Sequence, residues 1–180
     1  MGEHTLKIGD QTIDEFRSRI GEELGVSDWL TVTQEMIDKF SEATLDPDPM
    51  HTDPQWCAEH SPFKKPIAFG FMTLSLLIHL LHDVMKFRSL GSEAGEHPQY
   101  GLNYGLDRVR LMSPVPVNAR VRGRFVLADI RERNPGEYLQ TMDVTVEVEG
   151  QAKPALVAQW LSIFVTEEGH QRVATISAGN

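Results

Sequence analysis

Apolar residues in the first half of the chain recur at helical spacing. Within residues 11–24 the apolar positions are Ile13, Phe16, Ile20 and Leu24. Their spacing of three to four residues predicts a helix, which Gly25 is placed to end. A short strand is indicated at 29–32, and Thr33 is then suited to cap a second helix. The apolar positions of that second helix are Met36, Ile37, Phe40 and Ala43.

Proline and aspartate punctuate the chain after the second helix. The stretch DPDP at 46–49 places each aspartate before a proline, which favours extended backbone and disfavours helix there. Asp53 and Pro54 then match the cap and the first position of a short helix that reaches about His60.

The longest apolar run, residues 67–81, predicts a buried helix. Gly70 is expected to open this helix, which should continue to about Met85. The run is short for a membrane span and is interrupted by polar residues, so a core helix is the better interpretation. Residues 89–101, rich in Gly, Ser and Glu, predict a loop.

From residue 102 onward the apolar positions alternate, which indicates β-strands. In the first of these strands Leu102 and Leu106 share a face, but the apolar set resumes out of phase at Val109. This slip predicts a β-bulge near 105–108, because an extra residue on one strand shifts the alternation by one position.

Three further strands complete the predicted sheet. Alternation of apolar with charged or polar residues at 120–127 and 142–149 is typical of strands with one buried face. The NPG stretch at 134–136 and Gly150 supply turns. Residues 156–165 are apolar on both faces, as a central strand would be.

Helices followed by antiparallel strands place the chain in the α+β class, with the most apolar helix covered by the sheet. We expect one domain over residues 1–172 and a loose tail at 173–180.

Charge and composition narrow the possible functions. With 17 basic and 26 acidic residues the net charge is −9, which disfavours a broad nucleic-acid surface. Cys57 is the single cysteine, so an internal disulfide is excluded and a reducing cytosol is favoured. The first residues lack the apolar segment of a signal peptide. We therefore expect a cytoplasmic protein that binds neither nucleic acid nor a membrane.

Asp46 and His51 form the strongest candidate for catalytic chemistry. A fully extended chain would separate them by roughly 16 Å, so a turn near the prolines is needed to bring them together. A carboxylate and an imidazole around one water can remove a proton from it and return a proton to a neighbouring carbon. Gly70, at the start of the apolar helix, offers a backbone N–H for developing negative charge.

Two other interpretations of the same residues remain open. Asp46 and His51 could be turn residues, since Asp-Pro is a common turn pair. Asp46, Asp48, His51 and Asp53 could also bind a metal ion, but the segment lacks the Gly and terminal Glu of an EF-hand loop and matches no zinc spacing. We expect no metal.

Three stretches resemble a known family. The central one is FSEATLDPDPMHTDPQWCAEHSPFKKPIAFGFMTLSLL, flanked by GVSDWLTVTQEMIDKF and NYGLDRVRLMSPVPVNARVR. Together they cover most of residues 25–124, and they resemble the MaoC-like, (R)-specific enoyl-CoA hydratase family, in particular its nodulation protein N-like subgroup.

The resemblance implies a hot-dog fold, in which a curved antiparallel sheet wraps a long central helix, and a homodimer. It also implies syn hydration of a trans-2-enoyl-CoA thioester to the (R)-3-hydroxyacyl-CoA, with no cofactor because coenzyme A is part of the substrate. Asp46 and His51 correspond to the catalytic acid–base pair, and Gly70 to the residue whose N–H holds the thioester oxygen.

Further residues are expected to bind the acyl-CoA substrate. Tyr104 would contribute to the pocket wall, and the exposed cations Arg108 and Arg110 could contact a coenzyme A phosphate. Asp48 and Phe69 would lie at the edge of the same site.

Three positions depart from the family pattern. Asp48 replaces a common Asn, and its charge would disfavour ionised Asp46 and favour protonated His51. Phe69 replaces a His before the helix glycine, so it can pack the pocket wall but cannot form a hydrogen bond. Leu45 replaces a Gly, which indicates a slightly altered backbone before Asp46.

These departures keep two other functions open. The protein could bind acyl-CoA with little or no turnover, or it could hydrolyse the thioester on the same fold. Release of free thiol distinguishes hydrolysis from hydration.

Overall fold

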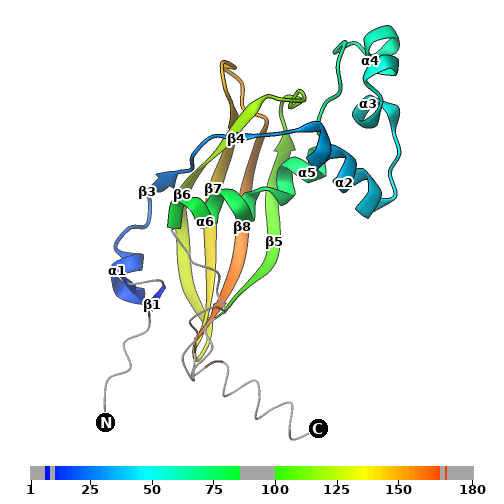
Figure 1. Ribbon diagram of the computed structural model, residues 1–180. Coiled ribbons are helices and arrows are strands. Elements are labelled where there is room, and N and C mark those ends of the chain that lie inside the picture. Colours follow the sequence, from blue (N-terminus) through cyan, green and yellow to red (C-terminus); the bar gives the residue numbers. More distant parts are fainter. Residues whose placement is uncertain (1–6, 9–10, 86–99, 167–168, 170–180) are drawn as a thin grey trace, which may run out of the picture.

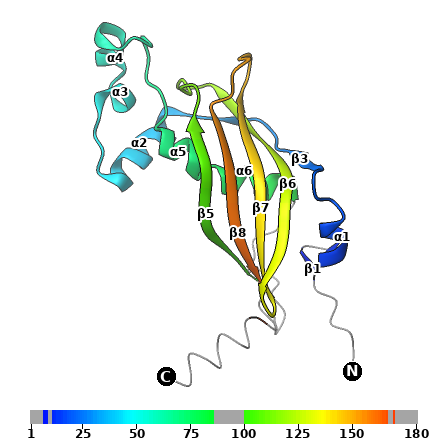
Figure 2. The same cartoon turned by 180° about the vertical axis from the view of Figure 1, so that it is seen from behind.

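A central helix packed against an antiparallel sheet forms the body of the protein. The computed structural model describes residues 7–8, 11–85, 100–166 and 169 of the chain. The helix lies on one face of the sheet, and in the reverse view no described helix covers the opposite face (Figures 1 and 2). This is the helix-and-sheet arrangement that the sequence predicts, so the α+β class is confirmed.

The main sheet has six antiparallel strands in the order β3-β6-β7-β8-β5, with β4 also paired to β6. Its strands are β3 (Glu23–Val26), β4 (Leu30–Thr31), β5 (Tyr100–Leu111), β6 (Arg120–Asn134), β7 (Glu137–Val148) and β8 (Leu156–Val165). A separate two-stranded sheet pairs β1 (Lys7–Ile8) with β2 (Gln11–Thr12). β8 lies between β7 and β5, which confirms its predicted central position.

Two irregularities in the sheet also agree with the sequence pattern. The register of β5 against β8 shifts between Asn103 and Gly105 and again between Asp107 and Arg110, as the predicted bulge requires. The turn between β6 and β7 contains Gly136 at φ +76°, a left-handed conformation that favours glycine.

Six helices precede β5 in the described chain. They are α1 (Ile13–Arg17), α2 (Gln34–Thr44), α3 (Pro49–Thr52), α4 (Pro54–His60), α5 (Gly70–Ser75) and α6 (Leu77–Met85). The predicted caps are confirmed, because Thr33 accepts a hydrogen bond from the backbone of α2 and Asp53 from that of α4.

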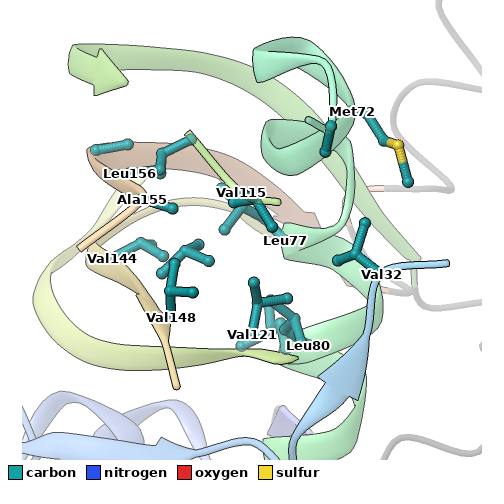
Figure 3. Close-up of a cluster of buried hydrophobic side chains, with 14 of the residues drawn as sticks. Val32, Met72, Leu77, Leu80, Val115, Val121, Val144, Val148, Ala155 and Leu156 are labelled. Atoms are coloured by element: carbon teal, nitrogen blue, oxygen red, sulfur yellow. The ribbon is translucent and has the colours of Figure 1, made fainter. Parts of the chain in front are cut away.

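The central helix is α5 followed by α6; it begins at Gly70 as the sequence predicts, and its last described residue is Met85. The two segments meet at Leu76, whose backbone stays in the right-handed helical region, so the direction of the chain is nearly kept. Their buried residues pack with the inward faces of β6, β7 and β8 (Figure 3). Leu80, only 1% exposed, shows the scale of this packing, since full burial of a leucine stabilises a fold by about 1.5–3 kcal/mol.

The helix predicted over residues 11–24 is confirmed only at Ile13–Arg17: Gln11 and Thr12 form β2, and the prediction is also wrong beyond Arg17. Gly21 takes a left-handed φ of +88°, and its N–H donates a hydrogen bond to the Leu127 carbonyl of β6. The chain then pairs with β6 as β3, which contains Leu24. The spacing of apolar residues does not show that β6 can form hydrogen bonds with the backbone of this segment.

The loop predicted over residues 89–101 ends earlier than expected. Tyr100 and Gly101, predicted as loop, begin β5. The rest of that predicted loop from residue 89, and the predicted tail at 173–180, lie outside the described residues. Within the described residues, no helix is both long enough and apolar enough to cross a membrane.

Gly136 and Gly150 both have a left-handed backbone conformation, but only Gly136 is closely packed. Substituting each by alanine therefore distinguishes the effect of steric overlap on stability from the effect of backbone strain. A Cβ on Gly136 would lie 2.3 Å from the backbone nitrogen of Gly169, whereas one on Gly150, at φ +74°, would meet nothing within 4 Å. We expect Gly150→Ala to lower the free energy of unfolding by about 1–2 kcal/mol through strain alone. Gly136→Ala should cost roughly 1–3 kcal/mol more, because backbone must move. Chemical denaturation measures both values, and equal losses would contradict this account.

Candidate functional site

The candidate residues Asp46 and His51 lie on a lobe beside the sheet. Helices α2, α3 and α4 form this lobe, residues 34–60, which we term the overhang. In both views it extends away from the sheet, beyond the N-terminal end of α5 (Figures 1 and 2). The site is therefore assembled where the overhang returns to the central helix.

A leucine in a left-handed conformation ends α2 immediately before Asp46. Leu45 has φ 59° and ψ 31°, and its N–H donates to the Ser41 carbonyl as a helix C-cap. Glycine adopts this conformation freely, whereas other residues incur a cost of roughly 1–2 kcal/mol. The leucine side chain is 88% exposed, so the fold accepts this cost without packing it against the described chain.

Asp46 and Asp48 each accept a hydrogen bond from a backbone N–H two residues further along the chain. Asp46 accepts a hydrogen bond from the Asp48 N–H at 3.3 Å, and Asp48 accepts one from the Met50 N–H at 2.8 Å. Asp48 thereby caps α3, whose first residue is Pro49. The prediction that Pro49 excludes helix is thus wrong for the residues after it, because a proline at the first helical position loses no internal hydrogen bond.

His51 is held in one tautomer by the segment that leads into the central helix. Its Nδ1 lies 2.6 Å from the Ile67 carbonyl oxygen. A carbonyl can only accept, so Nδ1 carries the proton, and Nε2 of the neutral ring is left as a proton acceptor. The ring also packs on Phe69, with centroids 3.8 Å apart, and Phe69 in turn contacts Phe40 at 5.3 Å. His51 is therefore fixed by both a hydrogen bond and a ring contact.

A cavity of about 210 Å³ lies beside His51. Its walls come from the overhang, the start of α5, the end of β5 and the segment before β8. The lining residues are His51, Ile67, Ala68, Gly70, Thr73, Leu111, Met112, Ser113, Pro114, Val115 and Ala155. Among these lining residues His51 alone is ionisable, so it is the candidate general base of the cavity.

Gly70 joins His51 in this cavity. It is the first residue of α5, and its cap residue Phe69 makes no side-chain hydrogen bond to the helix. The first N–H groups of a helix have no partner within it, so they can stabilise an anionic oxygen. A Cβ on Gly70 would lie 2.3 Å from Cδ1 of Leu111, so glycine lets the end of β5 approach the helix start.

Asp46 does not line the cavity, although it was expected beside His51. It is exposed, and its carboxylate is used in the hydrogen bond to Asp48. The single chain thus brings His51 and Gly70 together and leaves Asp46 outside. Phe69 is buried behind the imidazole rather than among the lining residues.

The expected substrate-binding residues of β5 are exposed and also lie outside the lining. Tyr104 packs under the guanidinium of Arg133 at 4.6 Å, about 20 Å along the strand from Leu111. Arg108 takes a φ of 53° at the bulge, and Arg110 donates to the carbonyl of Val109. Their contact with a substrate remains a prediction.

Two hydroxyl residues of the cavity were not predicted. Thr73 is buried, and its hydroxyl donates to the Phe69 carbonyl at 3.2 Å; Ser113 follows the end of β5. Thr73 could have been found, because it is a polar residue within the apolar run and lies one helical turn after Gly70. Ser113 carries no comparable signal.

Metal binding was a weaker alternative for the aspartates of the overhang. Among the residues that the structure describes, no group of three or more His, Cys, Asp or Glu side chains is placed to hold a metal ion.

Comparison with known proteins shows the family and agrees with the fold. The family described as MaoC like domain matches residues 15–151. Nodulation protein N of Rhizobium leguminosarum bv. viciae is 49% identical over 161 residues, which cover 89% of this chain and 92% of that protein. The 3-hydroxyacyl-thioester dehydratase Z of Mycobacterium tuberculosis (strain ATCC 25618 / H37Rv) is 39% identical over 155 residues, 86% and 97% of the two chains.

A solved structure confirms the hot-dog fold. The (R)-hydratase from A. caviae involved in PHA biosynthesis superposes with a TM-score of 0.61 at 20% sequence identity. The match covers 79% of this chain and 94% of that one.

Cys57 is predicted to be an unreactive thiol in the folded protein. It is fully buried, its Sγ lies 3.3 Å from the carbonyl oxygens of Pro49 and Met50, and burial raises the pKa of the thiol. We expect a disulfide reagent at pH 8 to modify it at least about 100-fold faster in denaturant than in the native state, because the thiolate is the nucleophile. Rapid stoichiometric reaction of the native protein would contradict the buried placement.

Proposed function

The chain belongs to the MaoC-like dehydratase family, and we propose that it catalyses (R)-specific hydration of trans-2-enoyl-CoA to (R)-3-hydroxyacyl-CoA. Membership supports a hydro-lyase, since a 3-hydroxyacyl-thioester dehydratase and an (R)-hydratase are among its relatives. The enoyl-CoA substrate and the (R) configuration are parts of our proposal.

The observation that carries the proposal is the shared cavity of His51 and Gly70. Nε2 of His51 would take a proton from water as the water oxygen bonds to C3 of the enoyl thioester. The π electrons would move through C2 to the thioester oxygen, which the Gly70 N–H would stabilise as an enolate. His51 would then return this proton to C2 on the same face, which would complete the addition and restore the neutral ring.

Asp46 would act as the second member of the acid–base pair. Its carboxylate would have to leave the Asp48 N–H, a long hydrogen bond of 3.3 Å on an exposed side chain, to reach the water. A neutral hydrogen bond contributes only about 0.5–1.5 kcal/mol, and one to a charged group about 1.5–3 kcal/mol. Breaking the Asp46–Asp48 hydrogen bond would therefore cost no more than a few kcal/mol.

The exposed position of Asp46 also favours a second candidate, an acyl-CoA-binding protein with weak turnover. Such a protein would keep the cavity and the Gly70 N–H without a complete acid–base pair. The two candidates share the ligand and differ in turnover.

A homodimer is the proposed assembly. Large apolar side chains remain exposed near the cavity: Leu111 and Met112, which line it, are 53% and 37% exposed, and Phe71, next to Gly70 in the chain, is 73% exposed. β5, an edge strand of the described sheet, adds exposed Leu102 and Leu106. A second copy covering this surface would remove apolar area from water and enclose the cavity.

Turnover of crotonyl-CoA tests the proposed function. Loss of the conjugated thioester absorbance should be rapid for wild type and about 10²- to 10⁴-fold slower for His51→Ala, because a general base contributes that much. Asp46→Asn should also be slow. His79→Ala is the matched control, since His79 is exposed and does not line the cavity.

The outcomes separate the candidates. Wild-type turnover no faster than His51→Ala across several chain lengths would contradict hydration. Calorimetric binding of acyl-CoA without turnover would favour the binding protein, and release of free thiol from saturated acyl-CoA would indicate a thioesterase.

A further inference from the structure

A half-buried glutamine at the start of α2 forms a hydrogen bond to the backbone of His51. The side-chain nitrogen of Gln34 donates to the His51 carbonyl oxygen at 2.8 Å and to Oδ1 of Asp38 at 2.8 Å. Its own Oε1 is buried and has no hydrogen-bond partner among the described residues. We infer that Gln34 is a positioning residue for His51. The Asp38–Gln34 pair holds the His51 peptide, and through it the imidazole, in place for the proposed hydration.

The orientation of the Gln34 amide is fixed by its neighbours. The Asp38 carboxylate and the His51 carbonyl can only accept, so the amide nitrogen must face both of them. This leaves Oε1 toward the interior, where an unsatisfied carbonyl costs about 1–3 kcal/mol. An apolar side chain at this position would avoid that cost, so the stability of α2 alone does not explain a glutamine here.

The helix that carries His51 depends on contacts from outside. α3 has four residues, too few for a helix to be stable by itself. The Cys57 thiol and the Ile67 N–H both lie 3.3 Å from the Met50 carbonyl oxygen, and the Ile67 carbonyl holds the His51 ring. The Gln34 bond ties the His51 peptide itself to α2.

Loss of the hydrogen bond from Gln34 to the His51 carbonyl should therefore affect turnover through the His51 ring. If the His51 peptide shifts, Nδ1 no longer meets the Ile67 carbonyl at 2.6 Å, and the proton can move to Nε2. A ring protonated at Nε2 cannot accept a proton from water in the cavity. The consequence is a loss in turnover with little change in substrate binding, since Gln34 does not line the cavity.

Turnover and the imidazole tautomer together test the inference in Gln34→Ala. We expect kcat for crotonyl-CoA to fall about 10- to 100-fold, with KM changed by less than about threefold, because misplacement of a catalytic group has effects of this size. In ¹⁵N spectra of histidine-labelled protein, the His51 signals, assigned by their loss in His51→Ala, should change from a single Nδ1-protonated form to a mixture.

Two variants exclude a merely structural role. Gln159→Ala is the matched control, because Gln159 also donates to an aspartate, Asp143 at 3.0 Å, on strands away from the cavity. It should leave kcat and the tautomer unchanged. Gln34→Glu with Asp38→Asn would restore a hydrogen bond within α2 but supply no donor to the His51 carbonyl. In this double variant kcat should stay reduced and the tautomers mixed, as in Gln34→Ala.

Either of two results would overturn the inference: wild-type kcat and tautomer in Gln34→Ala, or recovery of both in the double variant. The kinetic arm rests on the proposed function, but the tautomer is read without substrate. If wild type fails to hydrate crotonyl-CoA, the proposed function fails, and the spectra still decide whether Gln34 positions His51.

Discussion

The hydrogen bond from His51 to the Ile67 carbonyl is the interaction on which the site depends. It joins the overhang to the segment that begins the central helix, across 16 positions of the chain. It also fixes the proton on Nδ1, so that Nε2 can act as a base. Because Gly70 follows Ile67 by three residues, the same bond places the base and the helix-start amide in one cavity.

The two sides of the cavity differ in how they are supported. Gly70 and Leu111 belong to the central helix and the sheet, whose residues form the main buried core. His51 belongs to a one-turn helix on the overhang, which is stabilised by individual contacts from Gln34, Cys57, Ile67 and Phe69. In a site built in this way the proposed oxyanion-binding side at Gly70 is rigid, whereas the alignment of His51, the proposed base, depends on a few hydrogen bonds.

Local patterns predicted most of the fold because local physics decides it. A run that is apolar on both faces predicted β8 at Leu156–Val165, and Thr33 and Asp53 cap helices through side chains that bond within three residues. Residues 18–24 were predicted wrongly because the chain turns at 18–20 and its backbone pairs with β6 from Gly21 onward, a partner about a hundred residues away. The periodicity of a segment contains no information about a strand so far away in the sequence.

The site was predictable only where spacing determines geometry. His51 and Gly70 meet in the cavity as the motif suggests, but a spacing of five residues limits the distance of Asp46 without setting its direction. Tyr104 and Leu111 both belong to β5, but only Leu111 lines the cavity. The alternation of a strand indicates which face a side chain is on and does not indicate which end of the strand borders the site. Gln34 lies 17 residues before His51 and has no signal in the sequence, because its role follows from the packing of α2 against α3.

A crystal structure with (R)-3-hydroxybutyryl-CoA bound tests the central claim most directly. The account predicts the thioester oxygen within about 3 Å of the Gly70 nitrogen, and the C3 hydroxyl at Nε2 of His51. An acyl group bound outside this cavity, or a His51 ring that has left the Ile67 carbonyl, would contradict it.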